Sequence, residues 1–237
     1  MCVIAFSPAP ADVPTRDQLA RACDANPDGF GWAAVVGSRI VVHRAMDPGE
    51  AIDSYLDAVP MTTGPSLFHA RIASHGTVDL SNCHPFPVGG DPSVVLAHNG
   101  ILDITPGPFD SRSDTAILAD EVLPRSGIET LDTDPETWER WIGPGNKVVI
   151  LSTSPRLARH AYILNEPAGS WDAGVWWSNR SYQYTSPPWP ERRWEATDDG
   201  CAECEACSEY VPAAELVEYR RERICPDCAD AILEPAP

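Results

Sequence analysis

The chain has 237 residues, 43% of them hydrophobic, which is enough for one large domain or for one domain with a small module. Acidic residues outnumber basic ones by 35 to 17, and the formal net charge of −18 argues against a nucleic-acid partner, because such a surface needs clustered Lys and Arg. No apolar run approaches the ~20 residues of a membrane span and no signal peptide opens the chain, so we expect a cytoplasmic protein with no membrane partner.

The N-terminal part of the chain predicts short strands mixed with helices. An apolar run at 2–6 predicts a buried strand, and TRDQLARACDA (15–25) predicts a helix. The β-rich segments 29–36 and 39–45 are separated by a two-residue Gly-Ser turn, which is typical of a hairpin. A second helix is predicted over 48–59, where Pro-Gly opens the segment.

The middle of the chain is predicted to be strand-rich. Apolar runs at 66–72 and 93–98 predict buried strands, and 113–123 predicts a helix with a polar first turn. Further strands are predicted at 147–153, 158–164 and 174–179. Because strands and helices come in blocks rather than in strict alternation, the predicted fold class is α+β with mostly antiparallel sheets.

The composition changes after the last predicted strand. SPPWPERRWEATDDG (186–200) carries three prolines, mixed charge and no hydrophobic periodicity, which is typical of a linker. Five of the eight cysteines follow it. The predicted organisation is therefore a main domain over 1–185, a linker over 186–200 and a cysteine module over 201–237.

The cysteine module contains two CxxC pairs, at 204–207 and 225–228, with 17 residues between them. In a reducing compartment this spacing indicates a metal before a disulfide or surplus cysteines, and four thiolates suit tetrahedral Zn²⁺. A module this small cannot support its own core, so the ion would supply its folding energy. We therefore predict a structural zinc site whose ligands are Cys204, Cys207, Cys225 and Cys228. Cys201 and Cys204 are an alternative first pair. Its acidic flanks argue against DNA binding.

Short polar motifs follow several of the predicted strands. Taken singly, each is most simply explained as a turn or as a satisfied core residue. Together and in this order they resemble the class II glutamine amidotransferases, which are N-terminal nucleophile hydrolases, over roughly residues 2–180. The matching stretches are MC at the start, DGFGWA (28–33), HARIASHG (69–76), NCHPF (82–86), LAHNGIL (96–102), SDT (113–115) and WSN (177–179). The resemblance implies a four-layer αββα sandwich followed by the small zinc-binding module.

The resemblance makes Cys2 the nucleophile of a glutaminase reaction. A free thiol with a pKa of about 8.5 is only partly ionised at neutral pH. A free α-amine on the same residue titrates near ~8 and can serve as the base, so no separate histidine is needed. This chemistry requires that Met1 be removed, because an acylated nitrogen cannot accept a proton. It requires no cofactor.

The other site roles are also implied by the resemblance. Asn99 and Gly100 match the oxyanion hole, whose donors stabilise charge that appears only in the tetrahedral intermediate. Arg71 matches the residue that binds the α-carboxylate of L-glutamine, and Asp114 matches the residue that holds its α-ammonium group. Ser74 and His75 line the same substrate loop.

The chain departs from the family pattern in three places. Ile72 follows the arginine where a glucosamine-6-phosphate synthase has tryptophan, and Asn26–Asp28 replaces that enzyme's RGYDS-type segment. No synthase, phosphosugar or ATP-binding domain is visible in the sequence. The expected partner is therefore a separate ammonia-acceptor synthetase or another protein, which the zinc module could dock.

Three histidines in the motifs, His69, His84 and His98, invite a metal interpretation. They lack close i, i+4 pairing and an HExxH frame, so we expect structural roles for them. Two alternative functions stay open: an N-terminal nucleophile amidohydrolase acting on another amide, and a zinc-stabilised binding protein on a catalytically retired scaffold. The retained Cys2 and Asn99 favour the enzyme.

Overall fold

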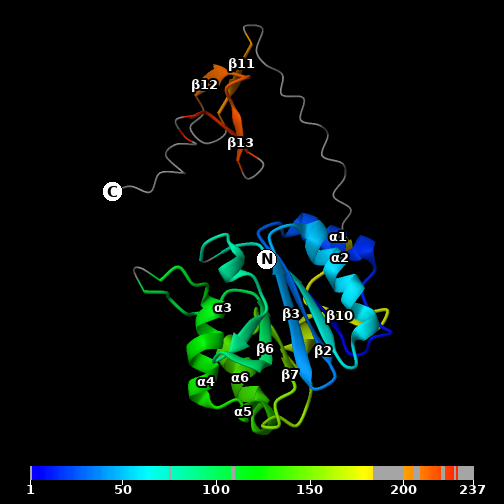
Figure 1. Ribbon diagram of the computed structural model, residues 1–237. Helices are drawn as coiled ribbons and strands as arrows, with labels where there is room; N and C mark the ends of the chain where they lie inside the picture. The colour runs from blue at the N-terminus through cyan, green and yellow to red at the C-terminus, as the bar shows by residue number, and fades with distance from the viewer. Residues whose placement is uncertain are drawn as a thin grey trace. The chain divides into compact units, whose positions relative to one another are not determined.

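The computed structural model describes residues 2–74, 76–107, 110–183, 200–204, 209–219, 222–226 and 228. The chain divides into two compact units, Met1–Ser186 and Pro187–Pro237, which are described separately. Figure 1 gives the course of the chain and the labels used below.

Two antiparallel sheets form the centre of the first unit. The larger sheet has the strand order β3 (Arg39–Ala45), β2 (Phe30–Val36), β4 (Ser66–Ala70), β1 (Val3–Ser7), β10 (Val175–Trp177) and β9 (Ser170–Asp172). The smaller sheet has the order β5 (Phe86–Val88), β6 (Asp91–Asn99), β7 (Lys147–Ser152) and β8 (Ala161–Leu164). The N-terminal strand β1 lies inside the larger sheet, paired with both β4 and β10, which fixes the position of the residue that precedes it.

The side chains of the two sheets alternate between two layers of core. One face of each sheet meets the other sheet in a cluster that includes Ile4, Leu67, Val95, Val149 and Trp176. The opposite faces are covered by helices, so the unit has the layers helix, sheet, sheet, helix (Figure 1).

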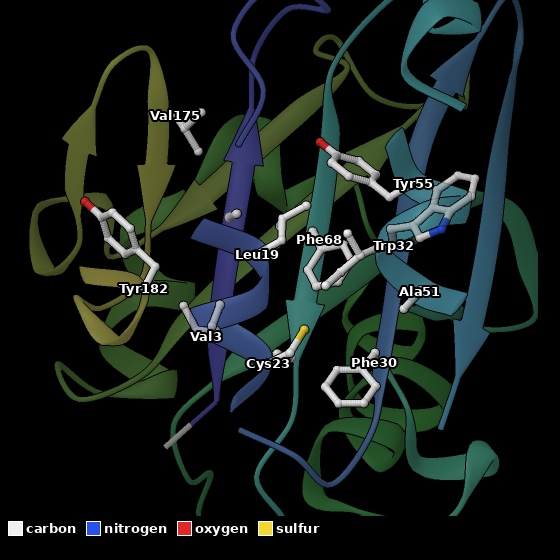
Figure 2. Packing of buried hydrophobic residues seen from close by; sticks show 14 of the residues in the cluster. Val3, Leu19, Cys23, Phe30, Trp32, Ala51, Tyr55, Phe68, Val175 and Tyr182 are labelled. Atoms are coloured by element: carbon white, nitrogen blue, oxygen red, sulfur yellow. The ribbon is translucent and has the colours of Figure 1, made fainter. Parts of the chain in front are cut away.

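Helices α1 (Arg16–Ala25) and α2 (Pro48–Ala58) cover the larger sheet. Thr15 closes a capping box with Gln18 at the start of α1, and Asp47 caps α2. Figure 2 shows their apolar side chains packed against the sheet, including Leu19 from α1 and Tyr55 from α2.

The smaller sheet is covered by a run of short helices. These are α3 (Asp114–Ile117), the π-helical turn η3 (Leu118–Val122), α4 (Leu123–Ser126), α5 (Thr130–Thr133) and α6 (Pro135–Ile142). Ser113 caps α3 through a hydrogen bond from the backbone N–H of Ala116, so the SDT motif is the start of this layer.

The second unit contains two short hairpins among its described residues. They pair β11 (Cys201–Glu203) with β12 (Tyr210–Pro212) and β13 (Val217–Tyr219) with β14 (Glu222–Ile224). Its small buried cluster consists of Cys204, Ile224 and Cys225, packed against Val211, Leu216 and Cys228. Half of this core is cysteine, so apolar burial alone contributes little to its stability.

The structure confirms the predicted α+β class with antiparallel sheets. It differs from the predicted elements in detail: β4 ends at Ala70 because Arg71 and Ile72 already turn into the loop that carries Ser74, and β5, β9, α5 and α6 were not predicted. Among the described residues, no helix has both the length and the apolar character that crossing a membrane requires.

Leu67 gives a test of the packing between the sheets, because its side chain is 0% exposed. We expect Leu67→Ala to lower the free energy of unfolding by about 2–5 kcal/mol, since it leaves a cavity in a close-packed layer. Leu80→Ala is the matched control, since Leu80 is 50% exposed, and should change stability by less than about 0.5 kcal/mol. Denaturant unfolding measures both, and equal effects would contradict the layer assignment.

Candidate active site

A pocket at the end of β1 brings together residues from five separate motifs. The lining residues are Cys2, Arg71, Ile72, Ser74, His84, His98, Gly100, Ser113, Asp114 and Thr115. Of the predicted glutaminase residues, Cys2, Arg71, Ser74, Gly100 and Asp114 therefore meet there. Asn99 is fully buried beside Gly100, and His75 lies outside the described residues.

Cys2 is half-buried and is held by its neighbours in the larger sheet. Its Sγ lies 3.5 Å from both the backbone N and the backbone O of Ile72, and its own carbonyl accepts a 2.6 Å hydrogen bond from the side chain of Asn179. Burial raises the pKa of the Cys2 thiol, while the backbone N–H of Ile72 works in the opposite direction. A thiol in this environment needs a nearby base before it can act as a nucleophile.

Ser178 connects the strand of the nucleophile to the HNG motif. Its Oγ accepts hydrogen bonds from the backbone N–H of Ile4 at 2.8 Å and from Nδ2 of Asn99 at 2.9 Å. One amide proton of Asn99 is used in this way, and the second is compatible with the predicted oxyanion role. The sequence contained Ser178 within WSN, but no role was assigned to it. The sequence signal that could have indicated this role is the polar pair Ser178 and Asn179, which directly follows the aromatic strand β10.

Gly100 has a backbone that other residues rarely adopt, with φ at +146°. A Cβ at this position would overlap the side-chain oxygen of Asn146. Glycine is therefore required by conformation and by space, and its backbone N–H is left at the edge of the pocket. This arrangement suits the predicted oxyanion role.

Asp114 is buried at the first position of α3, where its carboxylate is already partly occupied. Oδ2 accepts a hydrogen bond from the backbone N–H of Leu102 at 2.8 Å, and Oδ1 accepts one from the backbone N–H of Thr115 at 2.7 Å. The carboxylate thereby holds the segment after the HNG motif against α3. Remaining lone pairs can accept from a ligand at the pocket wall.

Arg71 is also buried, and its guanidinium donates to the carbonyl of Thr77 at 2.9 Å. This bond closes the loop that carries Ser74. Asp28, which received no site role from the sequence, fixes the same loop by accepting from the backbone N–H of Ala73 at 2.7 Å. A hydrogen bond thus joins the start of the DGFGWA motif to the loop that follows β4.

The three motif histidines form a buried group, of which His84 and His98 also line the pocket. The rings of His69 and His84 lie 4.0 Å apart, and Nδ1 of His84 accepts from the backbone N–H of His98 at 3.2 Å. His98 reaches Thr115 and Asn146 through its two ring nitrogens, each at 2.8 Å. Every one of these contacts joins neighbouring segments of the protein, which is a structural role.

Close packing explains why glycine recurs in DGFGWA. A Cβ at Gly31 would overlap the backbone oxygen of His84, so the NCHPF segment lies directly on β2. Arg44 of the adjacent strand donates two hydrogen bonds to the carbonyl of Pro85 from the same side. These contacts place His84 in the pocket wall.

In the second unit, the sulfur atoms of Cys204, Cys225 and Cys228 lie within 4.8 Å of one another. The backbone N–H of Cys225 donates to Sγ of Cys204 at 3.2 Å, as is favourable for a thiolate. Cys201 is not part of this cluster of described thiols, and Cys207 lies outside the described residues.

No family model matches the chain, and curated proteins are similar to part of it. It is 30% identical over 128 residues to a glutamine–fructose-6-phosphate aminotransferase (isomerizing) of Caulobacter vibrioides, covering 49% of this chain and 21% of that protein. The corresponding protein of Chlamydia caviae is 28% identical over 102 residues, covering 39% and 17%. The chain spans about a fifth of the length of these curated relatives.

These relatives, which are enzymes, and the motifs support a class II glutamine amidotransferase domain of the N-terminal nucleophile type in this chain. Among solved structures, the glutamine phosphoribosylpyrophosphate amidotransferase from B. subtilis in complex with ADP and GMP aligns with a TM-score of 0.49 and 17% identity. That alignment covers 75% of this chain and 41% of the other.

The buried histidines predict a loss of stability in mild acid. Burial lowers the pKa of His69 to about 3 and also lowers the pKa values of His84 and His98. The unfolded chain binds a proton on each near pH ~6.5, while His69 stays neutral in the folded chain, so His69 costs about 1.4 kcal/mol per pH unit below that value. His84 and His98 act in the same direction. We expect the free energy of unfolding to fall between about pH 6.5 and 5, above the range of ordinary carboxyl groups.

The dependence of the free energy of unfolding on pH gives a specific test of His69. His69→Gln keeps a donor for the carbonyl of His98, which Nε2 of His69 faces at 3.1 Å, but removes the titrating ring. Denaturant unfolding at several pH values should give a shallower slope for this variant. An unchanged slope would show that other titrating groups, and not His69, cause the loss of stability in acid.

Proposed function

We propose that this protein hydrolyses the side-chain amide of L-glutamine, with Cys2 as the nucleophile after removal of Met1. The observation that carries the proposal is the pocket in which Cys2 faces one buried cation, Arg71, and one buried carboxylate, Asp114. Two opposite charges set apart in one pocket select an amino acid by its α-carboxylate and α-ammonium groups. The amide end of the substrate then reaches Cys2.

Each step of the proposed reaction is assigned to a residue of the site. The α-amine of Cys2 takes the thiol proton, and Sγ attacks the amide carbon of glutamine. Asn99 and the backbone N–H of Gly100 donate to the oxyanion, the proton passes to the leaving nitrogen, and ammonia departs from a γ-glutamyl thioester. Water then attacks the thioester, which releases glutamate and restores the thiol.

We also propose that the ammonia is used by a separate protein. The curated relatives combine their matching segment with about four fifths of further sequence, to which this chain shows no match. An acceptor-binding partner would supply that part of the reaction. The second unit, with its own small core, is a suitable docking module for such a partner.

The second unit is proposed to hold a structural zinc ion. Three sulfur atoms within 4.8 Å of one another fit a shared tetrahedral ion, and Cys207 is the proposed fourth ligand. Four thiolates leave no open position, so the ion would stabilise the fold without taking part in hydrolysis.

The nucleophile can be tested directly. Cys2→Ala should reduce glutamate release from glutamine to background, whereas Cys23→Ala, which removes another buried thiol, should retain release. A reactive glutamine analogue should modify Cys2 alone, and intact mass should show that active protein lacks Met1. Persistent release by Cys2→Ala, or an adduct elsewhere, would contradict the proposal.

Metal content tests the second unit. Purified protein should carry about one zinc per chain, and Cys225→Ser should lose it while Cys23→Ser keeps it, because only Cys225 lies in the thiol cluster. Elemental analysis measures the metal, and proteolysis should cut the second unit faster once zinc is removed by a chelator. Zinc-free wild-type protein with a protected second unit would rule out this site.

A further inference from the structure

Lys147 is the only lysine in the sequence, since the other 16 of the 17 basic residues are arginines. It lies at the start of β7 and is 8% exposed. Within the described residues, no carboxylate lies within 4.0 Å of its ammonium group, and its one hydrogen bond, to the carbonyl of Gly145, is long at 3.5 Å. Burying an ammonium group with so few partners lowers the stability of the folded protein, which suggests a functional role for this lysine.

The strand register places this lysine beside the oxyanion residue. Lys147 is the direct cross-strand partner of Asn99 in the β6–β7 pair. Their strand neighbours Ala97 and Val149 belong to the core between the two sheets, and side chains alternate along a strand. Lys147 and Asn99 therefore project from the same face, toward the sheet that carries Cys2.

The side chain of Asn99 has an acceptor atom that lacks a donor among the described residues. Its side chain is 0% exposed, and Nδ2 donates to Ser178, but Oδ1 is buried without a partner among the described residues. Directly opposed residues in an antiparallel pair have Cβ atoms about 4.5–5.5 Å apart, which the four-carbon stem of a lysine easily spans. The nearest strand thus supplies a donor for this acceptor.

We propose that Lys147 is a positioning residue of the oxyanion hole, donating from Nζ to Oδ1 of Asn99 during the reaction. This inference rests on the proposed glutaminase function. The bond would hold the amide plane of Asn99 so that its second N–H faces the oxyanion on Cys2. It would also polarise the amide and so strengthen that N–H as a donor.

The surroundings fit lysine better than arginine. The turn before Lys147 is already fixed, because Asn146 bonds to His98 and to the carbonyl of Ile142, and Asn165 bonds to the carbonyls of Gly143 and Asn146. A compact ammonium on a flexible stem can turn from Gly145 to Asn99 without disturbing this turn. A planar guanidinium is larger and prefers paired acceptors.

Kinetics of three variants test the proposal. In Lys147→Met we expect kcat for glutamine hydrolysis to fall about tenfold to a hundredfold with KM changed less than about twofold, because the lost interaction acts on the transition state and not on bound glutamine. Lys147→Arg should recover part of kcat. Arg156→Met, which removes an exposed cation of the same unit, is the control for net charge and should match wild type.

A second readout uses the single lysine. Protein with 13C-labelled lysine gives one side-chain signal, which should shift when a glutamine analogue that carries a ketone is attached to Cys2. The shift should be lost in Asn99→Ala, since the contact would run through Asn99. Thermal unfolding of each variant separates misfolding from a defect in the site.

The outcomes separate this inference from the proposed function. Wild-type kcat in a folded Lys147→Met protein, or a lysine signal unmoved by the adduct, would overturn the role of Lys147 and leave the glutaminase intact. Absence of Cys2-dependent glutamate release from wild-type protein would overturn both.

Discussion

The hydroxyl of Ser178 is the contact on which the site depends. It receives one hydrogen bond from the backbone of β1, two residues after the nucleophile, and one from Asn99 at the end of β6. These two strands belong to different sheets. The distance between Cys2 and Asn99 is therefore set by how closely the sheets pack, and the apolar layer between them determines the geometry of the pocket.

The same packing determines the electrostatics. The space at the end of the two sheets holds buried groups of both signs together with three neutral histidines. In such surroundings a charge interacts more strongly with its neighbours than it does in water, and an unpaired polar atom is costly. Asp114, His69 and His84 each bond to a backbone group, so these residues also serve as the framework of the pocket.

Much of the first unit could be predicted from the sequence because its signals are local. Apolar runs and turn residues gave β1, β2, β3, β4, β6 and β7 to within a few residues, and the cap before α3 was visible in SDT. Helix α6 was missed although Asp134 and Pro135 form a helix start, because only two of its residues are buried and the run is short. Strands of three residues, such as β5 and β9, carry too little periodicity to be recognised.

The site was less predictable, for a different reason. Motifs identified Cys2, Arg71 and Asp114, but the contacts that hold them come from residues distant in the chain, such as Asp28 to Ala73 and Asn99 to Ser178. Nothing in a linear pattern states which polar atoms will be left without a partner after the sheets pack. Lys147 became informative only once the register of β6 and β7 showed that it stands opposite Asn99.

The position of Cys2 finally explains why the chain end matters to the chemistry. Its carbonyl is held by Asn179 and the next strand residues are paired on both sides, so the backbone after Cys2 is immobile in the sheet. In the proposed reaction the base is the backbone nitrogen of Cys2, freed by removal of Met1, and covalent geometry fixes its distance from the thiol.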